Sequence, residues 1–271
     1  MSFETCTVEK NGPVATVTII PPKSLTGGTA DLHWELGCVF SDLRSDNDIR
    51  VIVFTGYPGE FYEPGDPDFY DNAELRRYVT DPARAYKTFT GIVRTHMAMA
   101  EIEKPIVGKI TGNAIGFGSS LAFACDLIVA DEDVRFIDIH LGQGDVPFGP
   151  RFGIVAGDGG CSLIPLFMTP AKAKEYLFLA KEYSGRELAD MNIINYAVPT
   201  AQLDAVTDDI VTRLLNRGAF ALAWTKRAAN RHVVNQLNLT LDAAAAYEMV
   251  NFLQIERLNG ADPKTLTDEQ D

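Results

Sequence analysis

His140 has the sequence context of a catalytic base. It follows a strand-like segment, residues 134–139, and enters a loop rich in glycine, proline and aspartate. Loops at strand ends commonly carry catalytic groups, and an imidazole there can accept a proton near neutral pH. The other histidines lie in helical stretches, His33 and His96, or beside a charged neighbour, His232. We expect those three to be satisfied or solvated rather than catalytic.

Two carboxylates have settings that admit either a structural or a catalytic role. Asp158 lies in a run of glycines, residues 157–160, where it would cap a helix beginning near Gly160 and could also serve a site. Glu248 shares a helical face with apolar residues, namely Leu241, Ala244, Ala245, Phe252 and Ile255. A carboxylate on such a face is costly unless it is paired. Glu248 therefore belongs either to a site or to an inter-subunit salt link.

No separate nucleophile or metal site is indicated. Cys161 and Ser162 lie outside any G-x-S-x-G turn and are typical of small packed residues near a helix start. No His/Cys/Asp spacing resembles a metal site. The four cysteines are far apart and form no C-x-x-C pair: Cys6, Cys38, Cys125 and Cys161. They indicate a reducing cytosol, and we expect neither metal nor cofactor.

Composition and charge narrow the class of partner. With 271 residues, of which 46% are hydrophobic, the chain can bury a large core. A formal net charge of −13 without a Lys/Arg cluster argues against a nucleic-acid partner. The N-terminus does not resemble a signal peptide, and no apolar run reaches the roughly 18 residues of a membrane span. We expect a cytoplasmic globular enzyme with a small-molecule substrate and no membrane partner.

Hydrophobic periodicity predicts an α/β fold that gives way to helices. The expected strands are residues 4–10, 15–20, 51–54, 106–110 and 127–130, and the expected helices among them are 30–43, 82–102 and 119–125. From Pro165 onward we expect helices only, one starting at Pro170 and others over 201–215, 219–234 and 241–258. The acidic tail after Gly260 is expected to be disordered.

Six segments form an ordered series: Lys104–Val107, Thr111–Ala122, Cys125–Ala130, Arg135–Phe136, Ser184–Ala189 and Val198–Pro199. This series resembles the crotonase (enoyl-CoA hydratase/isomerase) superfamily. The resemblance implies a spiral of ββα units with active-site loops over residues 1–199, a helical oligomerisation region over 200–260 and a disordered tail over 261–271. It also implies a homotrimer or homohexamer. The last helices carry more apolar surface than is needed to cover one domain, as burial between subunits would require.

The same resemblance implies an oxyanion hole made of backbone N–H groups. By position these lie near Glu63, in the segment 61–66, and at Phe117 and Gly118 in the glycine-rich turn. N–H groups at a turn that enters a helix point at one spot, where the helix dipole favours an enolate or alkoxide. From the residues alone, Gly116 and Gly118 need only allow a tight turn packed under a helix.

Two positions depart from the hydratases of the superfamily. Where those enzymes carry paired catalytic glutamates, this chain has Ser120 and His140. A serine cannot act as a carboxylate acid or base at neutral pH. The two-glutamate addition of water to an enoyl thioester is therefore not expected.

Further segments fit these departures: Lys23–Leu25, the pattern Phe136-x-Asp138-x-His140, and Gly153–Gly159 with Pro165. They resemble the β-diketone hydrolases of the superfamily, which include 6-oxocamphor hydrolase and cleave a carbon–carbon bond without coenzyme A. In that group a histidine and an aspartate serve the water, and a glutamate on the last long helix assists. The resemblance implies these roles for His140, Asp158 and Glu248.

Two differences separate this chain from that group. Extra residues lie between His140 and Gly153, among them Gly142–Asp145. Gly27 and Phe117 stand where those hydrolases use a tryptophan and a histidine as oxyanion donors. The substrate carbonyl must therefore be held by other groups.

The favoured hypothesis is a hydrolase that cleaves a β-diketone by a retro-Claisen reaction. His140 takes a proton from water, Asp158 fixes its tautomer, and backbone N–H groups stabilise the enolate. The alternative is a coenzyme A-dependent crotonase acting on an acyl-CoA thioester with isomerase, thioesterase or dehalogenase-like chemistry, because the turn at 116–118 is retained. A non-catalytic protein that binds a ligand or assembles is the third class.

Overall fold

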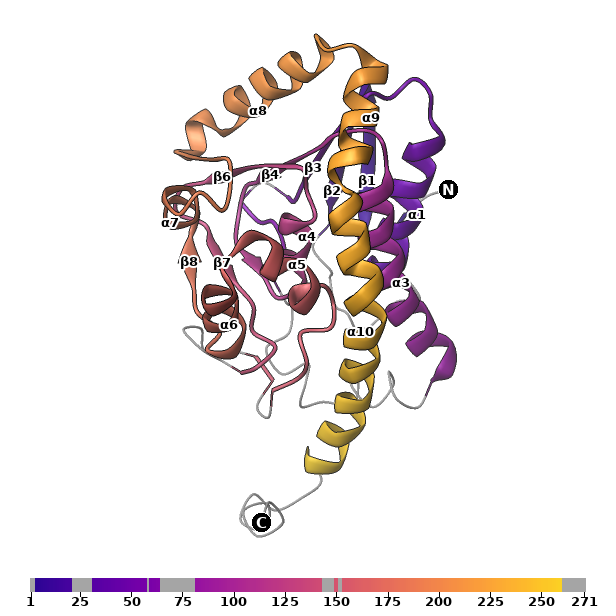
Figure 1. Cartoon of the computed structure of the whole chain (residues 1–271), viewed down its shortest axis with the longest axis vertical. Helices are drawn as coiled ribbons and strands as arrows, with labels where there is room; N and C mark the ends of the chain where they lie inside the picture. Colours follow the sequence, from indigo (N-terminus) through magenta and orange to yellow (C-terminus); the bar gives the residue numbers. More distant parts are fainter. Residues whose placement is uncertain are drawn as a thin grey trace.

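A six-stranded sheet forms the centre of the computed structural model, which describes residues 3–20, 31–57, 59–63, 81–142, 149–150 and 153–259 (Figure 1). The strand order is β1-β2-β3-β4-β6-β9. The strands are β1 Cys6–Asn11, β2 Val14–Ile19, β3 Val51–Thr55, β4 Ile106–Ile110, β6 Leu127–Asp131 and β9 Tyr196–Val198. β1 and β2 form an antiparallel hairpin, and the remaining neighbours run parallel.

A three-stranded sheet brings two distant segments of the chain to one edge. It consists of β5 Ala114–Ile115, β7 Arg135–Ile137 and β8 Tyr183–Ser184, in that order. β5 and β7 are parallel. The turn after Ile115 and the segment after Ile137 therefore leave the sheet at the same end, which sets the geometry of the site described below.

Helices cover both faces of the large sheet. They are α1 Leu32–Ser45, α3 Pro82–Glu101, α4 Phe117–Phe123, α5 Gly160–Phe167, α6 Pro170–Phe178, α7 Gly185–Asp190, α8 Thr200–Leu215, α9 Ala219–Ala229 and α10 Arg231–Asn259. Asp31 and Asp81 cap α1 and α3 by accepting hydrogen bonds from backbone N–H groups of the first turn. Among the described helices, none is both long enough and apolar enough to cross a membrane.

Alternate residues of β3 face two separate cores. Ile52 and Phe54 belong to the large core that also includes side chains of α1 and α3. Val51 and Val53 belong to a smaller core under α8. A parallel strand buried on both faces reads as a continuous apolar run, which is the pattern that predicted this strand.

The predicted alternation of strands and helices is confirmed over the first half of the chain, but two later expectations are wrong. The chain after Pro165 contains strands as well as helices. β8 belongs to the three-stranded sheet and β9 to the six-stranded sheet. These strands are two and three residues long, too short to show a period. The last helices divide at Asn230 rather than after Val234. The amide of Asn230 donates to the carbonyl of Ala100, which fixes the chain where it changes direction.

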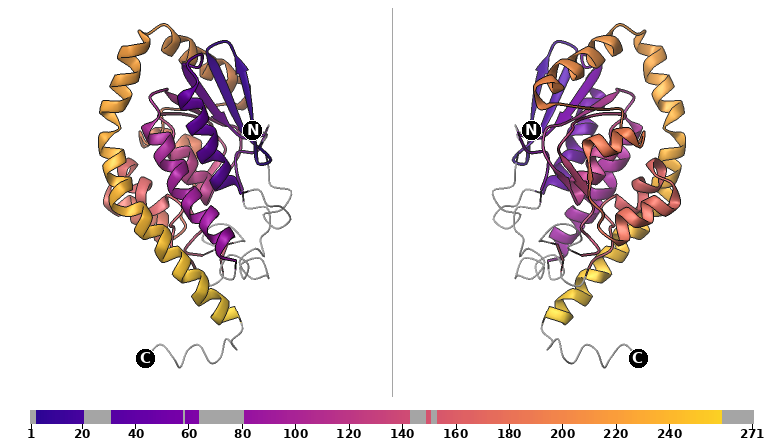
Figure 2. Two further views of the ribbon diagram at one scale, coloured as in Figure 1. Left: turned by 90° about the vertical axis from the view of Figure 1, so that its right-hand side faces the viewer. Right: turned by 90° about the vertical axis from the view of Figure 1, so that its left-hand side faces the viewer.

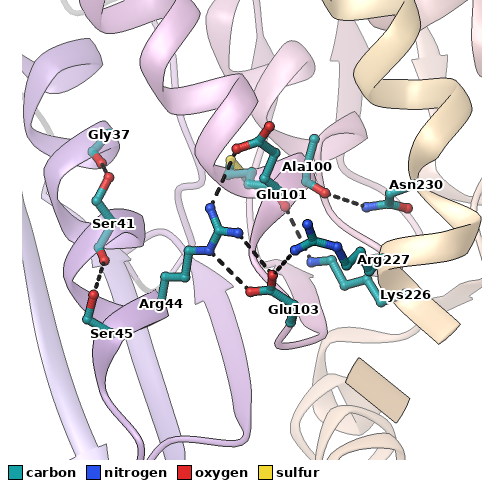
Figure 3. A network of polar contacts seen from close by, with 11 residues as sticks. Gly37, Ser41, Arg44, Ser45, Ala100, Glu101, Glu103, Lys226, Arg227 and Asn230 are labelled. Atoms are coloured by element: carbon teal, nitrogen blue, oxygen red, sulfur yellow. Dashed lines mark hydrogen bonds and ion pairs between the residues drawn. The ribbon is translucent and has the colours of Figure 1, made fainter. Parts of the chain in front are cut away.

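The last two helices fold back along the side of the same chain, where α10 packs on α3 and α5 (Figures 1 and 2). A polar network anchors α9 (Figure 3). Nζ of Lys226 lies 2.6 Å from Asp126, with its side chain only 5% exposed. Next to it, the exposed Arg227 pairs with Glu103 at 2.6 Å, and Arg44 binds the same carboxylate at 2.9 Å.

The buried ion pair of α9 predicts a large loss of stability on substitution. Lys226→Met should lower the free energy of unfolding by about 3 kcal/mol, because it leaves the carboxylate of Asp126 without its cation in a poorly solvated place. Arg227→Met, one residue away, should cost less than about 1 kcal/mol, because the side chain of Arg227 is 46% exposed and Glu103 keeps Arg44 as a second cation. Urea denaturation followed by circular dichroism measures both. Equal losses would contradict the assignment.

Candidate active site

His140 is buried directly after β7, and a nearby aspartate fixes its ring. Its exposed fraction is 3%. Oδ1 of Asp138 lies 2.7 Å from Nδ1 of His140 and also accepts the backbone N–H of His140 at 3.0 Å. Both contacts lie within one short turn, so the local backbone sets the ring's orientation. The aspartate at the tautomer-fixing position is therefore Asp138 and not Asp158 as expected.

Asp158 lies on the opposite edge of the imidazole ring. Its Oδ2 is 3.1 Å from Nε2 of His140. Its Oδ1 accepts a hydrogen bond from the hydroxyl of the buried Ser120 at 3.3 Å. The prediction that Asp158 caps α5 is wrong, because the N-cap residue is Gly159 and no side chain caps that helix. The carboxylate is held by side chains instead.

Glu248 reaches the same histidine from the far end of the chain. It lies on α10 with an exposed fraction of 5%, and its Oε1 is 4.0 Å from Nε2 of His140. Its other oxygen, Oε2, has no hydrogen-bond partner among the described residues. A Cβ added to Gly157 would lie 2.6 Å from Oε2, so the glycine allows α10 to approach. The three predicted residues His140, Asp158 and Glu248 thus lie together within one chain.

The electrostatic environment sets a different protonation state for each group. Burial by itself lowers the pKa of His140, but the carboxylates of Asp138 and Asp158 outweigh it and raise that pKa well above its ordinary value. Burial opposes ionisation of Asp158, yet the charge and hydrogen bond of His140 prevail and lower its pKa. Burial, followed by the charge of Asp158, raises the pKa of Glu248 well above its ordinary value. Within the cluster, the shifts favour a proton on the ring of His140 and on Glu248, and they favour the ionised form of Asp158.

The glycine-rich turn presents backbone N–H groups beside this cluster. Gly116 has φ +58°, a conformation that favours glycine, and α4 begins at the next residue. No acceptor in the described part of the chain pairs with the backbone N–H of Phe117 or Gly118. A Cβ at Gly118 would lie 2.8 Å from the carbonyl oxygen of Tyr62, which places Glu63 next to the turn.

Two further histidines, His33 and His96, lie near this cluster, although both were expected to be satisfied or solvated. His96 was expected to be satisfied, and its Nδ1 does contact the carbonyl oxygen of Ile92 at 2.8 Å. Its Nε2, however, is buried without a partner in the described residues. The ring of His33 lies 4.2 Å from that of Phe117, centroid to centroid. Helical spacing alone does not reveal which helix faces a site, whereas the alternation in Asp138-x-His140 did signal that these two side chains share a face.

Some predicted features lie outside the described residues. These are Lys23–Leu25, Gly27, Gly65, Asp66, most of the extra segment between His140 and Gly153, and the tail after Gly260.

Sequence and structure comparisons agree on the family. The profile of the enoyl-CoA hydratase/isomerase family matches residues 9–258. A short-chain-enoyl-CoA hydratase of Clostridium acetobutylicum is 25% identical over 252 residues, which cover 93% of this chain and 89% of the relative. A solved enoyl-CoA hydratase/isomerase from Mycobacterium paratuberculosis is 27% identical with a TM-score of 0.78, over 93% of this chain and 95% of that chain.

A β-diketone hydrolase from the cyanobacterium Anabaena, solved with (S)-3-oxocyclohexyl acetic acid bound, has a TM-score of 0.78 at 22% identity. This likeness covers 94% of this chain and 96% of that chain. At 22% identity this likeness shows a similar fold and nothing more. The predicted fold class, a crotonase-like α/β spiral followed by helices, is confirmed, and the chain belongs to the enoyl-CoA hydratase/isomerase family of the crotonase superfamily.

Proposed function

We propose that this protein hydrolyses a carbon–carbon bond of a β-diketone without coenzyme A. The observation that supports this proposal most is the setting of His140. Asp138 binds Nδ1, so Nε2 is the nitrogen that faces Asp158 and Glu248. Asp138 holds one ring nitrogen, and Nε2, which also lies 3.1 Å from Asp158, is the nitrogen at which a histidine base would exchange a proton. The 4.0 Å between Nε2 and Oε1 of Glu248 lets a single water bind both atoms at hydrogen-bond distance.

The proposed reaction returns every group to its starting state. His140 without a proton on Nε2 takes one from the bound water while the water oxygen attacks a ketone carbon. The bond from that carbon to the central carbon then breaks, which yields a carboxylic acid and an enolate. Backbone N–H groups at Phe117 and near Glu63 bind the oxygen that carries the negative charge. The enolate carbon finally takes the proton from Nε2.

Ser120 and His140, which stand where the resemblance places the paired hydratase glutamates, also support this reaction. Ser120 is fully buried, and its hydroxyl donates to Asp158. It therefore orients a carboxylate and has no acid–base function of its own at neutral pH. His140 activates the nucleophilic water by taking its proton. Glu248, whose pKa is raised, can donate a hydrogen bond from its protonated form to the substrate oxygen or the water.

One observation favours the alternative, a coenzyme A-dependent reaction. An ionised Asp158 next to a protonated Glu248 is a base and an acid side by side, which two-carboxyl chemistry on an acyl thioester requires. The curated relatives at 25% identity carry hydratase names. Calorimetry with a panel of acyl-CoA esters separates the two proposals. Absence of binding at millimolar concentration would remove the alternative.

Replacing the histidine should abolish most of the proposed activity. His140→Ala should slow cleavage of β-diketones by about 10²- to 10⁴-fold, the usual loss for a general base. The assay follows the ultraviolet absorption of a panel of cyclic and linear β-diketones. His232→Ala is the matched control, since that histidine is exposed on α10. An unchanged rate in a folded His140→Ala protein would refute the assigned base.

The rate of cleavage should rise with pH through the pKa of His140. Only the form without a proton on Nε2 accepts one, and two carboxylates raise this pKa above its ordinary value. Asp138→Asn removes one of these charges, so the pKa should fall and the rising limb should move to lower pH. Asp133→Asn, in the exposed turn before β7, should leave the profile unchanged. A limb that stays in place in Asp138→Asn would contradict the role given to Asp138.

We also propose a homotrimer or homohexamer held by the last helices. Large apolar side chains stand exposed on α9 and α10: Phe220, Trp224, Tyr247, Val250 and Leu253. Light scattering should give a multiple of 29.7 kDa. Truncation before Leu239 should abolish both assembly and activity, because it removes the α10 part of this surface together with Glu248. A monomer mass for the intact, active protein would overturn the proposal.

A further inference from the structure

A second aspartate–histidine pair lies on the other side of the glycine-rich turn. His33, in the first turn of α1, packs its ring against Phe117 with the centroids 4.2 Å apart and the planes inclined by 42°. Phe117 is the residue whose backbone N–H has no acceptor in the described part of the chain. The side chain of His33 is 14% exposed, compared with 4% for His140. His33 is thus largely buried but still accessible to a ligand.

Asp31 holds the ring of His33 by one nitrogen. Oδ1 of Asp31 lies 3.2 Å from Nδ1 of His33 and accepts the backbone N–H of Trp34 at the same distance. Oδ2 accepts the hydroxyl of Thr88 at 2.5 Å. Burial works against ionisation, but these hydrogen bonds and the nearby His33 lower the pKa of Asp31 to about 2. An ionised Asp31 favours a proton on Nδ1, and Nε2 is the ring nitrogen that Asp31 does not bind.

One face of α3 is dedicated to holding this pair. Thr88, Gly91 and Thr95 follow each other at helical spacing along that face. The hydroxyl of Thr95 donates to the carbonyl of His33 at 2.6 Å. A Cβ at Gly91 would lie 2.6 Å from the backbone nitrogen of Trp34, so the glycine is needed for the close approach. Helix α1 is therefore positioned at His33 by side chains and backbone together, as a site residue requires.

His33 also lies within electrostatic range of the His140 cluster. Its charge contributes to lowering the pKa of Asp158 and that of His96. His33 therefore lies near Asp158 and His96, with its ring packed against Phe117. Neither Gly27 nor Phe117 has a side-chain hydrogen-bond donor, so a side-chain donor to the oxygen would have to come from another position.

We propose that His33 binds the substrate oxygen that becomes the enolate, by donating a hydrogen bond from Nε2, and that Asp31 positions it. The inference rests on the proposed β-diketone chemistry. With Asp31 accepting the Nδ1 proton, the imidazolium form carries a second N–H on Nε2. The ring of His33 packs against the side chain of Phe117, whose backbone N–H has no acceptor in the described residues, so a ring and a backbone group can share the oxygen. A hydrogen bond that strengthens as charge develops acts mainly on kcat.

Binding of an enolate tests the proposal without any turnover. The probe is 1,3-cyclohexanedione, a cyclic β-diketone that is largely ionised to its enolate at neutral pH. Calorimetry should show that His33→Phe, which keeps a ring but loses the donor, weakens binding about 10- to 100-fold. His33→Gln retains an N–H donor and should recover part of the affinity. His232→Phe, on the exposed face of α10, is the matched control and should bind like the wild type.

Two further measurements separate recognition from a structural role. In the folded wild type, the ¹⁵N signal of His33 Nε2 should shift when the enolate binds. In a cleavage assay, His33→Phe should lower kcat by about 10²-fold with little change in KM. Asp31→Asn should lower kcat in the same direction by a smaller factor, because the ring remains but is less firmly held.

The outcomes distinguish this inference from the proposed function. If the wild type binds the enolate through His33 but cleaves no β-diketone, the proposed hydrolase fails and the recognition site stands. If β-diketones are cleaved and His33→Phe binds and reacts like the wild type, the inference is overturned and the hydrolase stands. Absence of enolate binding and of any ¹⁵N shift in the wild type also overturns the inference.

Discussion

A buried histidine held between two carboxylates is the constraint on which the rest of the site depends. An ionised side chain inside a protein is tolerated only when it is paired, because removing it from water costs several kcal/mol. His140 is paired on both ring edges, at 2.7 Å by Asp138 and at 3.1 Å by Asp158. A further negative charge would be unfavourable there, which is why burial and the charge of Asp158 raise the pKa of Glu248 well above its ordinary value.

The run of glycines before α5 makes this cluster possible. Gly157 touches Glu248 on α10, Gly159 lies against His96 on α3, and Gly160 lies against Asp138 after β7. A side chain at any of these positions would separate groups that must meet. Gly159 also has φ +122°, in the region that side chains rarely adopt. The glycines therefore mark the crossing point of three distant segments, and capping of α5 does not explain them.

The family to which this chain belongs does not by itself determine its reaction. The chain shares its fold with the enoyl-CoA hydratase/isomerase family. At the positions where the resemblance places a pair of glutamates, the sequence has a serine and a histidine instead. Function is thus argued from the site and not from the fold. His33 on α1 and His96 on α3 also lie near the cluster, and no sequence motif identifies them.

Local patterns in the sequence determined five of the six strands of the large sheet, most helices and the strand-end position of His140, because periodicity and turn chemistry act over a few residues. They also marked Asp158 and Glu248 as residues that needed a partner. Only the tertiary structure decided which partner each one has. Glu248 lies far along the chain from His140, and the ring edge that each carboxylate faces depends on how α5 and α10 pack against β7. The placement of His33 and His96 likewise depends on the packing of α1 and α3, for which helical spacing carries no signal. Long-range packing brings these side chains together, and short-range sequence patterns do not show which faces of the helices will meet.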